Sequence, residues 1–244
     1  MDAVREFIKE IKLYAAALAK WLALAAVAGV VCGFIGSAFH ISVGYVTALR
    51  GAHGWLLWLL PAAGLAIVGV YRLFGTEGEG TNDIIDAVHL GKPLPVLLLP
   101  SIFIGTVLTH LCGGSAGREG AALQMGGTIG YWAGRLFRLD DRDTRTATLC
   151  GMAAFFSALF GTPLAATMFA IMVISVGNFY HTAFIPCFAA SLVSYGISMW
   201  LGVAPTRFAV AVPSLAPANL LEVAVLAALC AWVSAIFCKL LNFT

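Results

Sequence analysis

The sequence predicts an all-α polytopic membrane protein, and three observations support this fold class. Of the 244 residues, 61% are hydrophobic and 11% are charged, a balance that ordinary soluble domains do not have. Several apolar stretches reach the roughly 20 residues that a helix needs to cross a bilayer. Other apolar stretches are short or are broken by glycine and proline, which is typical of helices that line a transport pathway. The net charge of +2 gives no indication of a nucleic-acid partner.

The first segment, residues 1–15, is charged and amphipathic. Val4, Ile8, Ile11 and Ala15 lie on one face at helical spacing, so we expect a helix on the membrane surface and no cleavable signal peptide. Positive charge gathers just before the first apolar stretch, at Arg5, Lys9, Lys12 and Lys20. By the positive-inside rule, the N-terminus is expected in the cytoplasm. The expected location is the plasma (inner) membrane.

Residues 21–49 form an apolar run that exceeds the length of one crossing, so this helix should tilt. Gly29, Gly33 and Gly36 lie near one face of it. Small residues let helix backbones approach closely in membranes, so this face is expected to pack against another helix. Residues 55–74 are the second predicted span.

A polar, glycine-rich loop follows at residues 75–82. The helix expected at 83–89 is too short to cross a membrane, and Asn82 or Thr81 is expected to cap its start. Three prolines introduce a third span, which should end near Cys112.

Residues 113–120, Gly-Gly-Ser-Ala-Gly-Arg-Glu-Gly, form a glycine-rich loop with an arginine–glutamate pair between two apolar segments. Glycines allow backbone N–H groups to face a ligand closely. A helix that begins at Glu119 would direct its free N–H groups and the positive end of its dipole at this loop. The pattern predicts an anion site with an acid at its mouth, because ionisable groups at membrane depth are costly and usually functional.

The helix expected at 120–137 carries four glycines and should lie inside the protein. Residues 138–145 are highly charged and are interpreted as a solvated connector. Shorter helices are expected at 146–160 and 163–176, separated at Gly161-Thr162-Pro163.

The last two predicted spans are residues 183–201 and 220–241, joined by a proline-containing loop at 202–218. Two of the glycine loops in the chain precede a helix start. If both helix N-termini converge on one point, their backbone dipoles would replace part of the hydration shell of an anion.

Three segments together resemble the CLC family of chloride channels and proton-coupled anion transporters. Gly117-Arg118-Glu119-Gly120 and the glycine-rich helix after it resemble the GREGP segment of that family. Residues 157–169 resemble the segment that ends in N-A-P-L-A-G. Gly78-Glu79-Gly80-Thr81-Asn82 stands where the family carries GSGIP, and the order and spacing of the three segments agree.

The resemblance implies a CLC-like helical bundle with short, broken and re-entrant helices, and this chain matches only the first of the two inverted repeats. It implies an amphipathic helix at 1–15, a first-repeat membrane domain at 16–218, and the first helix of a truncated second repeat at 219–244. A full-length chain is expected to form a homodimer with one pathway per subunit.

The resemblance also implies residue roles. Glu119 is expected to be the protonatable gate. The implied anion-binding residues are Gly80, Thr81, Asn82, Gly117, Arg118, Gly120 and Ala121. The implied partners are a halide anion, protons and the lipid bilayer, and neither a cofactor nor a metal is implied.

The chain departs from the family pattern at three positions. Ala121 replaces the proline after GREG, and Glu79 replaces the GSGIP serine if the segments align without a gap. An ionised Glu79 would repel an anion, so it is expected to be protonated, turned away or shifted in alignment, leaving Thr81 or Asn82 to bind. Val173 stands where coupled transporters carry a second glutamate. Together these departures favour the fluoride-transporting branch.

Other interpretations stay open. The protein could be a passive chloride channel, or a non-transporting half-protein that needs a partner chain. Glu119 could form a buried bridge with Arg118 or Arg135, and Glu77 and Asp86 could be ordinary solvated acids. The scattered histidines and the six cysteines are expected to be packing residues. No nucleophile–base set or metal cluster predicts an enzyme.

Overall fold

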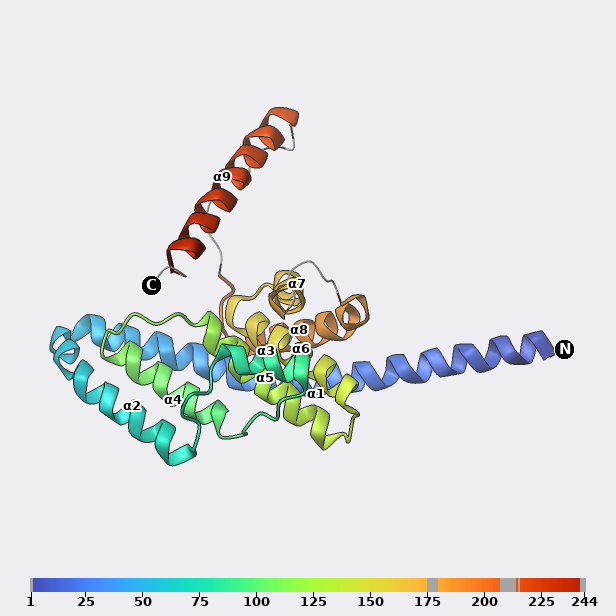
Figure 1. Cartoon of the computed structure of the whole chain (residues 1–244), viewed down its shortest axis with the longest axis horizontal. Coiled ribbons are helices and arrows are strands. Elements are labelled where there is room, and N and C mark those ends of the chain that lie inside the picture. Colours follow the sequence, from blue (N-terminus) through green and yellow to red (C-terminus); the bar gives the residue numbers. More distant parts are fainter. Residues whose placement is uncertain (1, 175–179, 207–213, 215, 242–244) are drawn as a thin grey trace. The chain divides into compact units, whose positions relative to one another are not determined.

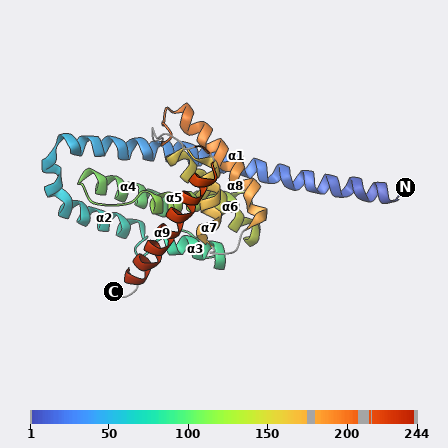
Figure 2. The same ribbon diagram turned by 90° about the horizontal axis from the view of Figure 1, so that it is seen from above.

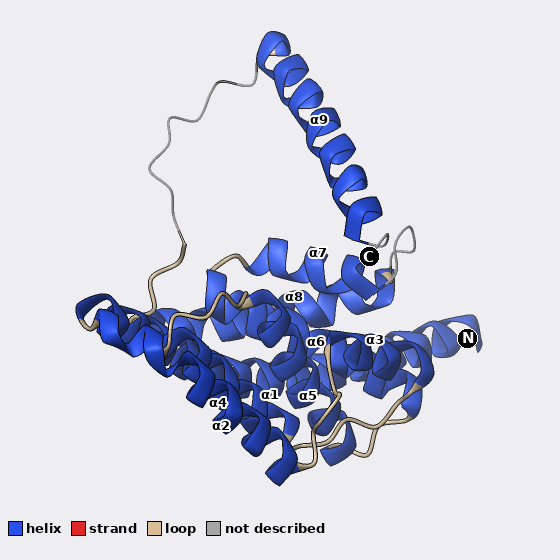
Figure 3. Cartoon of the chain, turned by 60° about the vertical axis from the view of Figure 1, so that its left-hand side comes forward, coloured by secondary structure: helices blue, strands red, loops and turns tan. Residues whose placement is uncertain are grey.

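A computed structural model describes residues 2–174, 180–206, 214 and 216–241. These residues form helices joined by loops, and no strand occurs in the described part of the chain (Figure 3). The chain divides into two compact units, Met1–Thr206 and Arg207–Thr244. The first unit contains the helices of the candidate site.

The first helix, α1, runs without a break from Asp2 to Ala52. Its N-terminal part extends beyond the helices that pack against the rest of it (Figure 1). No glycine or proline stands between Asp2 and Gly29, so nothing in the sequence interrupts the helix at the expected boundary near residue 15. No break separates residues 2–15 from the first span, so the expected amphipathic segment is the first part of α1.

The glycines of α1 pack as expected. A β-carbon added at Gly29 or Gly33 would collide with Val193 or Ile197 of α8, which spans His181–Trp200. A β-carbon at Gly36 would collide with Ala158. These glycines therefore let three helix backbones approach closely.

The second part of the chain is built from short elements. A 3₁₀ turn at Gly54–Leu59 leads into α2 at Leu60–Phe74, and α3 covers Thr81–Leu90. The next helix, α4 at Leu98–Leu111, packs beside α2 (Figure 2).

The cap of α3 differs from the expectation. Neither Asn82 nor Thr81 caps the helix, because the N-cap residue is Gly80 and its backbone is extended. The carboxylate of Asp83 accepts a hydrogen bond from the Gly80 N–H at 2.5 Å. An acid at the third helical position thus takes the place of a capping side chain.

The helices α5 (Glu119–Leu136) and α6 (Asp141–Phe160) form the most closely packed pair. A β-carbon at Gly126 would meet the carbonyl oxygen of Gly151, and one at Gly130 would meet that of Ala147. The expectation that α5 lies inside the protein is confirmed.

The charged connector at 138–145 is shorter than expected. Asp140 caps α6 by accepting a hydrogen bond from the Asp143 N–H at 2.7 Å, so residues 141–145 already belong to the helix. Lys20 of α1 pairs with Asp143 at 2.5 Å. The start of α6 is therefore tied to the N-terminal half of α1.

The remaining helices are α7 at Pro163–Ile174, α8, and α9 at Pro217–Leu241. Gly161 ends α6 with a φ of +69°, the left-handed conformation that favours glycine, and so separates α6 from α7 as expected. Residues 175–176 of the expected helix and residues 207–213 and 215 of the 202–218 loop lie outside the described residues.

Four stretches of described helix are long and apolar enough to cross a membrane: Arg5–Ala52, Gly54–Phe74, His181–Trp200 and Pro217–Leu241. The helices α4 and α7 are apolar but shorter. The core of the first unit is centred on Phe39, whose ring packs against Phe103 and Phe155 at centroid distances of 5.4 and 6.2 Å. This core holds α1, α4 and α6 together and fixes the helices that carry the site.

Candidate functional site

The N-termini of α3 and α5 lie against each other. Gln124 in the first turns of α5 donates from Nε2 to the Oγ1 atom of Thr81, the first residue of α3, at 3.0 Å. A β-carbon at Gly120 would lie 3.4 Å from the same Thr81 oxygen. The structure therefore brings together two helix starts that are almost 40 residues apart in the sequence.

The start of α5 carries no side-chain cap. Its N-cap residue is Arg118, whose side chain makes no capping hydrogen bond. The N–H groups of a first turn have no partner within the helix and carry the positive end of the helix dipole. An anion placed here would find backbone donors that no side chain of the N-cap residue occupies.

Glu119, the first residue of α5, is exposed, and its carboxylate folds back over the loop. A β-carbon at Gly117 would lie only 2.7 Å from Oε2 of Glu119. A larger residue at 117 would displace this carboxylate. Glu119 forms no ion pair with Arg118 or Arg135 in the described part of the chain, so the expected alternative of a buried bridge is wrong for this structure.

Lys92 provides a counter-charge that the sequence did not suggest. Its Nζ atom lies 3.2 Å from a carboxylate oxygen of Glu79 and 2.6 Å from one of Asp83. Glu79 is thus ion-paired with Lys92, an arrangement that is compatible with a carboxylate turned away from the anion. Gly91, with a φ of +73°, reverses the chain after α3 and brings Lys92 back towards the start of that helix.

The Lys92 ion pairs shift the pKa values of Asp83 and of Lys92 itself. Both residues lie outside the four helical stretches that are long and apolar enough to cross a membrane. The hydrogen bond from Lys92, helped by the Gly80 N–H, lowers the pKa of Asp83. The hydrogen bond to Asp83 raises the pKa of Lys92, and Glu79 adds to this effect. Both groups are therefore held in their charged forms, and the negative charge beside the start of α3 is partly neutralised.

The other predicted site residues differ in exposure. Ala121 is buried, with 7% of its surface exposed, whereas Asn82 and Gly117 are exposed. Gly80, Thr81, Arg118 and Gly120 are half-buried. Of these residues, Thr81 and Gly120 are the pair that meets directly.

His40 of α1 lies within electrostatic reach of Arg118, and its Nδ1 atom is buried without a hydrogen-bond partner among the described residues. No local pattern distinguishes this histidine from the others, because the contact joins segments almost 80 residues apart. Glu77, by contrast, pairs with Arg72 at 2.8 Å on an exposed surface, as a solvated acid would.

Comparisons with known proteins agree with this architecture. A family model described as "Voltage gated chloride channel" matches residues 63–244. The chain is 38% identical over 195 residues to the "Chloride/fluoride channel protein" of Pseudomonas syringae pv. tomato, covering 79% of this chain and 43% of that protein. It is 39% identical over 166 residues to the "H(+)/Cl(-) exchange transporter ClcA" of Cronobacter sakazakii, covering 62% and 36%.

The fold is similar to that of a crystal structure described as a "CLC-type fluoride/proton antiporter". The TM-score is 0.78 at 34% sequence identity, with 84% of this chain and 53% of that chain covered. The chain therefore spans about half the length of the relatives it matches, in agreement with a match to the N-terminal half. Because the family model matches well over half of this sequence and the helices follow the same arrangement, the chain belongs to the CLC family of voltage-gated chloride channels, as an integral membrane protein.

Proposed function

We propose that this protein takes part in CLC-type transmembrane transport of a halide anion, and that Glu119 is the protonatable gate. The observation that carries the proposal is the contact between the N-termini of α3 and α5 at Thr81, Gly120 and Gln124. Two sets of backbone N–H groups and two positive helix ends meet there, and together they can replace part of the hydration shell of a halide.

The position of Glu119 suggests how the gate works. Its carboxylate lies over Gly117, beside the uncapped first turn of α5, where it competes with a halide for the same N–H groups. Protonation removes its charge and weakens its hold on these donors, so a halide can replace it. Proton binding and anion movement are thereby linked at one residue.

Fluoride is the halide that we favour. The two relatives with fluoride in their descriptions align with most of this chain, and the chain carries Glu79, Ala121 and Val173 at the departures noted above. The Lys92 ion pair reduces the repulsion between Glu79 and an approaching anion. A passive chloride channel is the alternative, in which Glu119 gates without proton coupling.

The test is ion flux in liposomes, followed with fluoride- and chloride-selective electrodes and a pH-sensitive dye. We expect fluoride efflux coupled to proton movement, and loss of the proton movement in Glu119→Gln. Glu77→Gln is the matched control, because it removes an exposed acid outside the contact between α3 and α5. Unchanged, still pH-dependent flux in Glu119→Gln would disprove the gate.

Because the chain spans about half the length of its relatives, we propose a second experimental arm. The chain is reconstituted alone and together with the C-terminal half of the Pseudomonas syringae relative. Flux that requires the second half would support a half-protein that works with a partner chain. The same proposal includes a homodimer with one pathway in each subunit, an N-terminus in the cytoplasm and a location in the plasma membrane. It also includes the division of the chain into segments 1–15, 16–218 and 219–244.

A further inference from the structure

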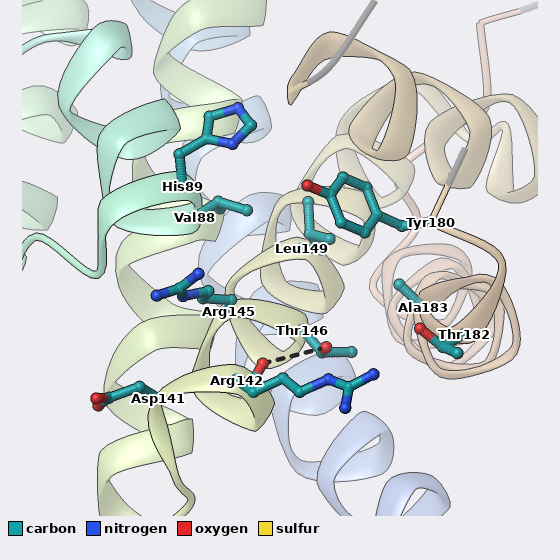
Figure 4. Close-up of a pocket in the computed structure, with 10 residues that line it drawn as sticks. All are labelled: Val88, His89, Asp141, Arg142, Arg145, Thr146, Leu149, Tyr180, Thr182 and Ala183. Carbon is teal, nitrogen blue, oxygen red and sulfur yellow. Dashed lines mark hydrogen bonds between the residues drawn. The ribbon is translucent and has the colours of Figure 1, made fainter. Parts of the chain in front are cut away.

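A cavity of about 530 Å³ lies at the opposite end of α3 from the candidate halide site. Its walls come from the end of α3, the first turns of α6 and the start of α8 (Figure 4). Thr81 and His89 are eight residues apart on α3, so about 12 Å separates the cavity from the contact between α3 and α5. The proposed halide gate does not use any of the residues that line it.

The cavity carries positive charge that the protein does not neutralise. Arg142 and Arg145 stand one turn apart on α6 and both line it. Neither forms an ion pair within the described residues, and the Nε atom of Arg145 is buried without a hydrogen-bond partner there. Burying a guanidinium N–H group without an acceptor costs free energy, unless a bound ligand supplies the acceptor.

The acids near the cavity are mostly engaged elsewhere. Asp143 pairs with Lys20, and Asp140 caps α6. Asp141 also lines the cavity but forms no ion pair with either arginine among the described residues, so two guanidinium groups and one carboxylate leave a net positive charge in its wall. This balance favours an anionic ligand.

Other donors at the cavity favour an anion with several oxygens. Figure 4 shows Arg142 extending towards Thr182 at the start of α8, while Arg145 lies on the side of α3. Tyr180 and Thr182 add hydroxyl groups to the wall, and Tyr180 makes no side-chain cap on α8. His89 also lines the cavity, with Nε2 held at 2.8 Å from the carbonyl oxygen of Ile174. A cavity of this volume is far larger than a halide. A guanidinium group can donate two parallel hydrogen bonds to two oxygens of a phosphate group.

We propose that this cavity binds a phosphate group, carried either by an anionic lipid headgroup or by free phosphate. The Lys20–Asp143 pair places the cavity at the end of the bundle where the N-terminal half of α1 carries its positive charges. That is the side we assign to the cytoplasm, and basic pockets between helices on that side are suited to lipid headgroups.

The test measures binding and does not depend on transport. Purified protein is mixed with phosphatidic acid in phosphatidylcholine nanodiscs, and retained lipid is detected by native mass spectrometry. In a second arm, inorganic phosphate is added in detergent at constant ionic strength, and the melting temperature is followed. Arg142→Gln and Arg145→Gln should each weaken binding about tenfold or more, the usual effect of losing one charge-assisted hydrogen bond.

Arg138→Gln is the matched control, since Arg138 stands just before the start of α6 but does not line this cavity. Arg142 is exposed, so its variant should fold even if loss of Arg145 disturbs packing.

Retained phosphatidic acid without a response to inorganic phosphate identifies a lipid headgroup, whereas a response to both shows that the phosphate group is sufficient. Equal binding in the wild type and both cavity variants, or an equal loss in Arg138→Gln, would overturn the proposal. Glu119→Gln should bind as the wild type does, which separates this inference from the proposed gate.

Discussion

Gln124 donates a hydrogen bond from its Nε2 atom to Oγ1 of Thr81 at 3.0 Å, and this bond joins the start of α5 to the start of α3. The two helices belong to segments that meet only in the folded protein. Their relative position decides whether both sets of N-terminal N–H groups can reach one anion. The contribution of this bond can be measured by replacing each of its two side chains.

We expect Gln124→Ala and Thr81→Val each to lower the free energy of unfolding by about 1 kcal/mol, the usual net value of such a bond. The double variant should lose less than the sum of the two, because each change removes the same interaction. Denaturant titration in detergent measures all three variants. Fully additive losses would show that the two side chains act independently and that another contact holds the helix starts together.

Replacing Gly117 with alanine should disturb the gate. The new β-carbon would lie 2.7 Å from Oε2 of Glu119, so the carboxylate must move away from the loop. We expect altered pH dependence of anion efflux from liposomes with little loss of folded protein. Gly54→Ala is the control, since a β-carbon there meets no atom within 4 Å. Identical pH profiles for Gly117→Ala and the wild type would contradict the assigned position of Glu119.

Replacing Lys92 with methionine should change how stability depends on pH. Lys92 lowers the pKa of Asp83 below its ordinary value of 3.8, so its stabilising effect through Asp83 is complete above that value. The effect disappears as the pH falls through the lowered pKa of the folded state. At the alkaline end, the raised pKa of Lys92 means that stabilisation is lost as the pH rises past the ordinary Lys value of 10.5 and through the folded value.

The melting temperature of Lys92→Met should therefore fall below that of the wild type at neutral pH and approach it in strong acid. Arg72→Met removes an exposed ion pair with Glu77 and serves as the control, because such pairs contribute little. We also expect slower anion entry in Lys92→Met, since Glu79 loses its counter-charge. A pH-independent difference in melting temperature would argue against the Lys92–Asp83 pair as its cause.

Replacing Gly130 with valine should separate α5 from α6. A β-carbon at this position would overlap the Ala147 carbonyl, which is backbone and cannot turn aside. We expect a loss of at least about 2 kcal/mol in the free energy of unfolding, as for other overpacked sites. In contrast, Gly196→Ala on α8 meets open space and should be neutral or stabilise the helix by up to about 1 kcal/mol. The yield of monodisperse protein and its denaturant midpoint compare the two variants.

Local patterns in the sequence determined the membrane class, the order of the helices and the main packing surfaces. Apolar runs set the spans, and the glycines of α1 and α5 indicated where backbones approach each other. The start of α5 at Glu119 followed from the glycine-rich loop before it. These features depend on residues within a few turns of one another, so the sequence alone could predict them.

Only the tertiary structure decided the contacts between distant segments. It brought Thr81 to Gln124, Lys92 to Glu79, and Asp143 to Lys20. None of these pairs has a signature in local periodicity, because the partner of a polar side chain depends on how whole helices pack. The cavity with Arg142 and Arg145 arises in the same way, where three helix ends that are separate in the sequence meet in space.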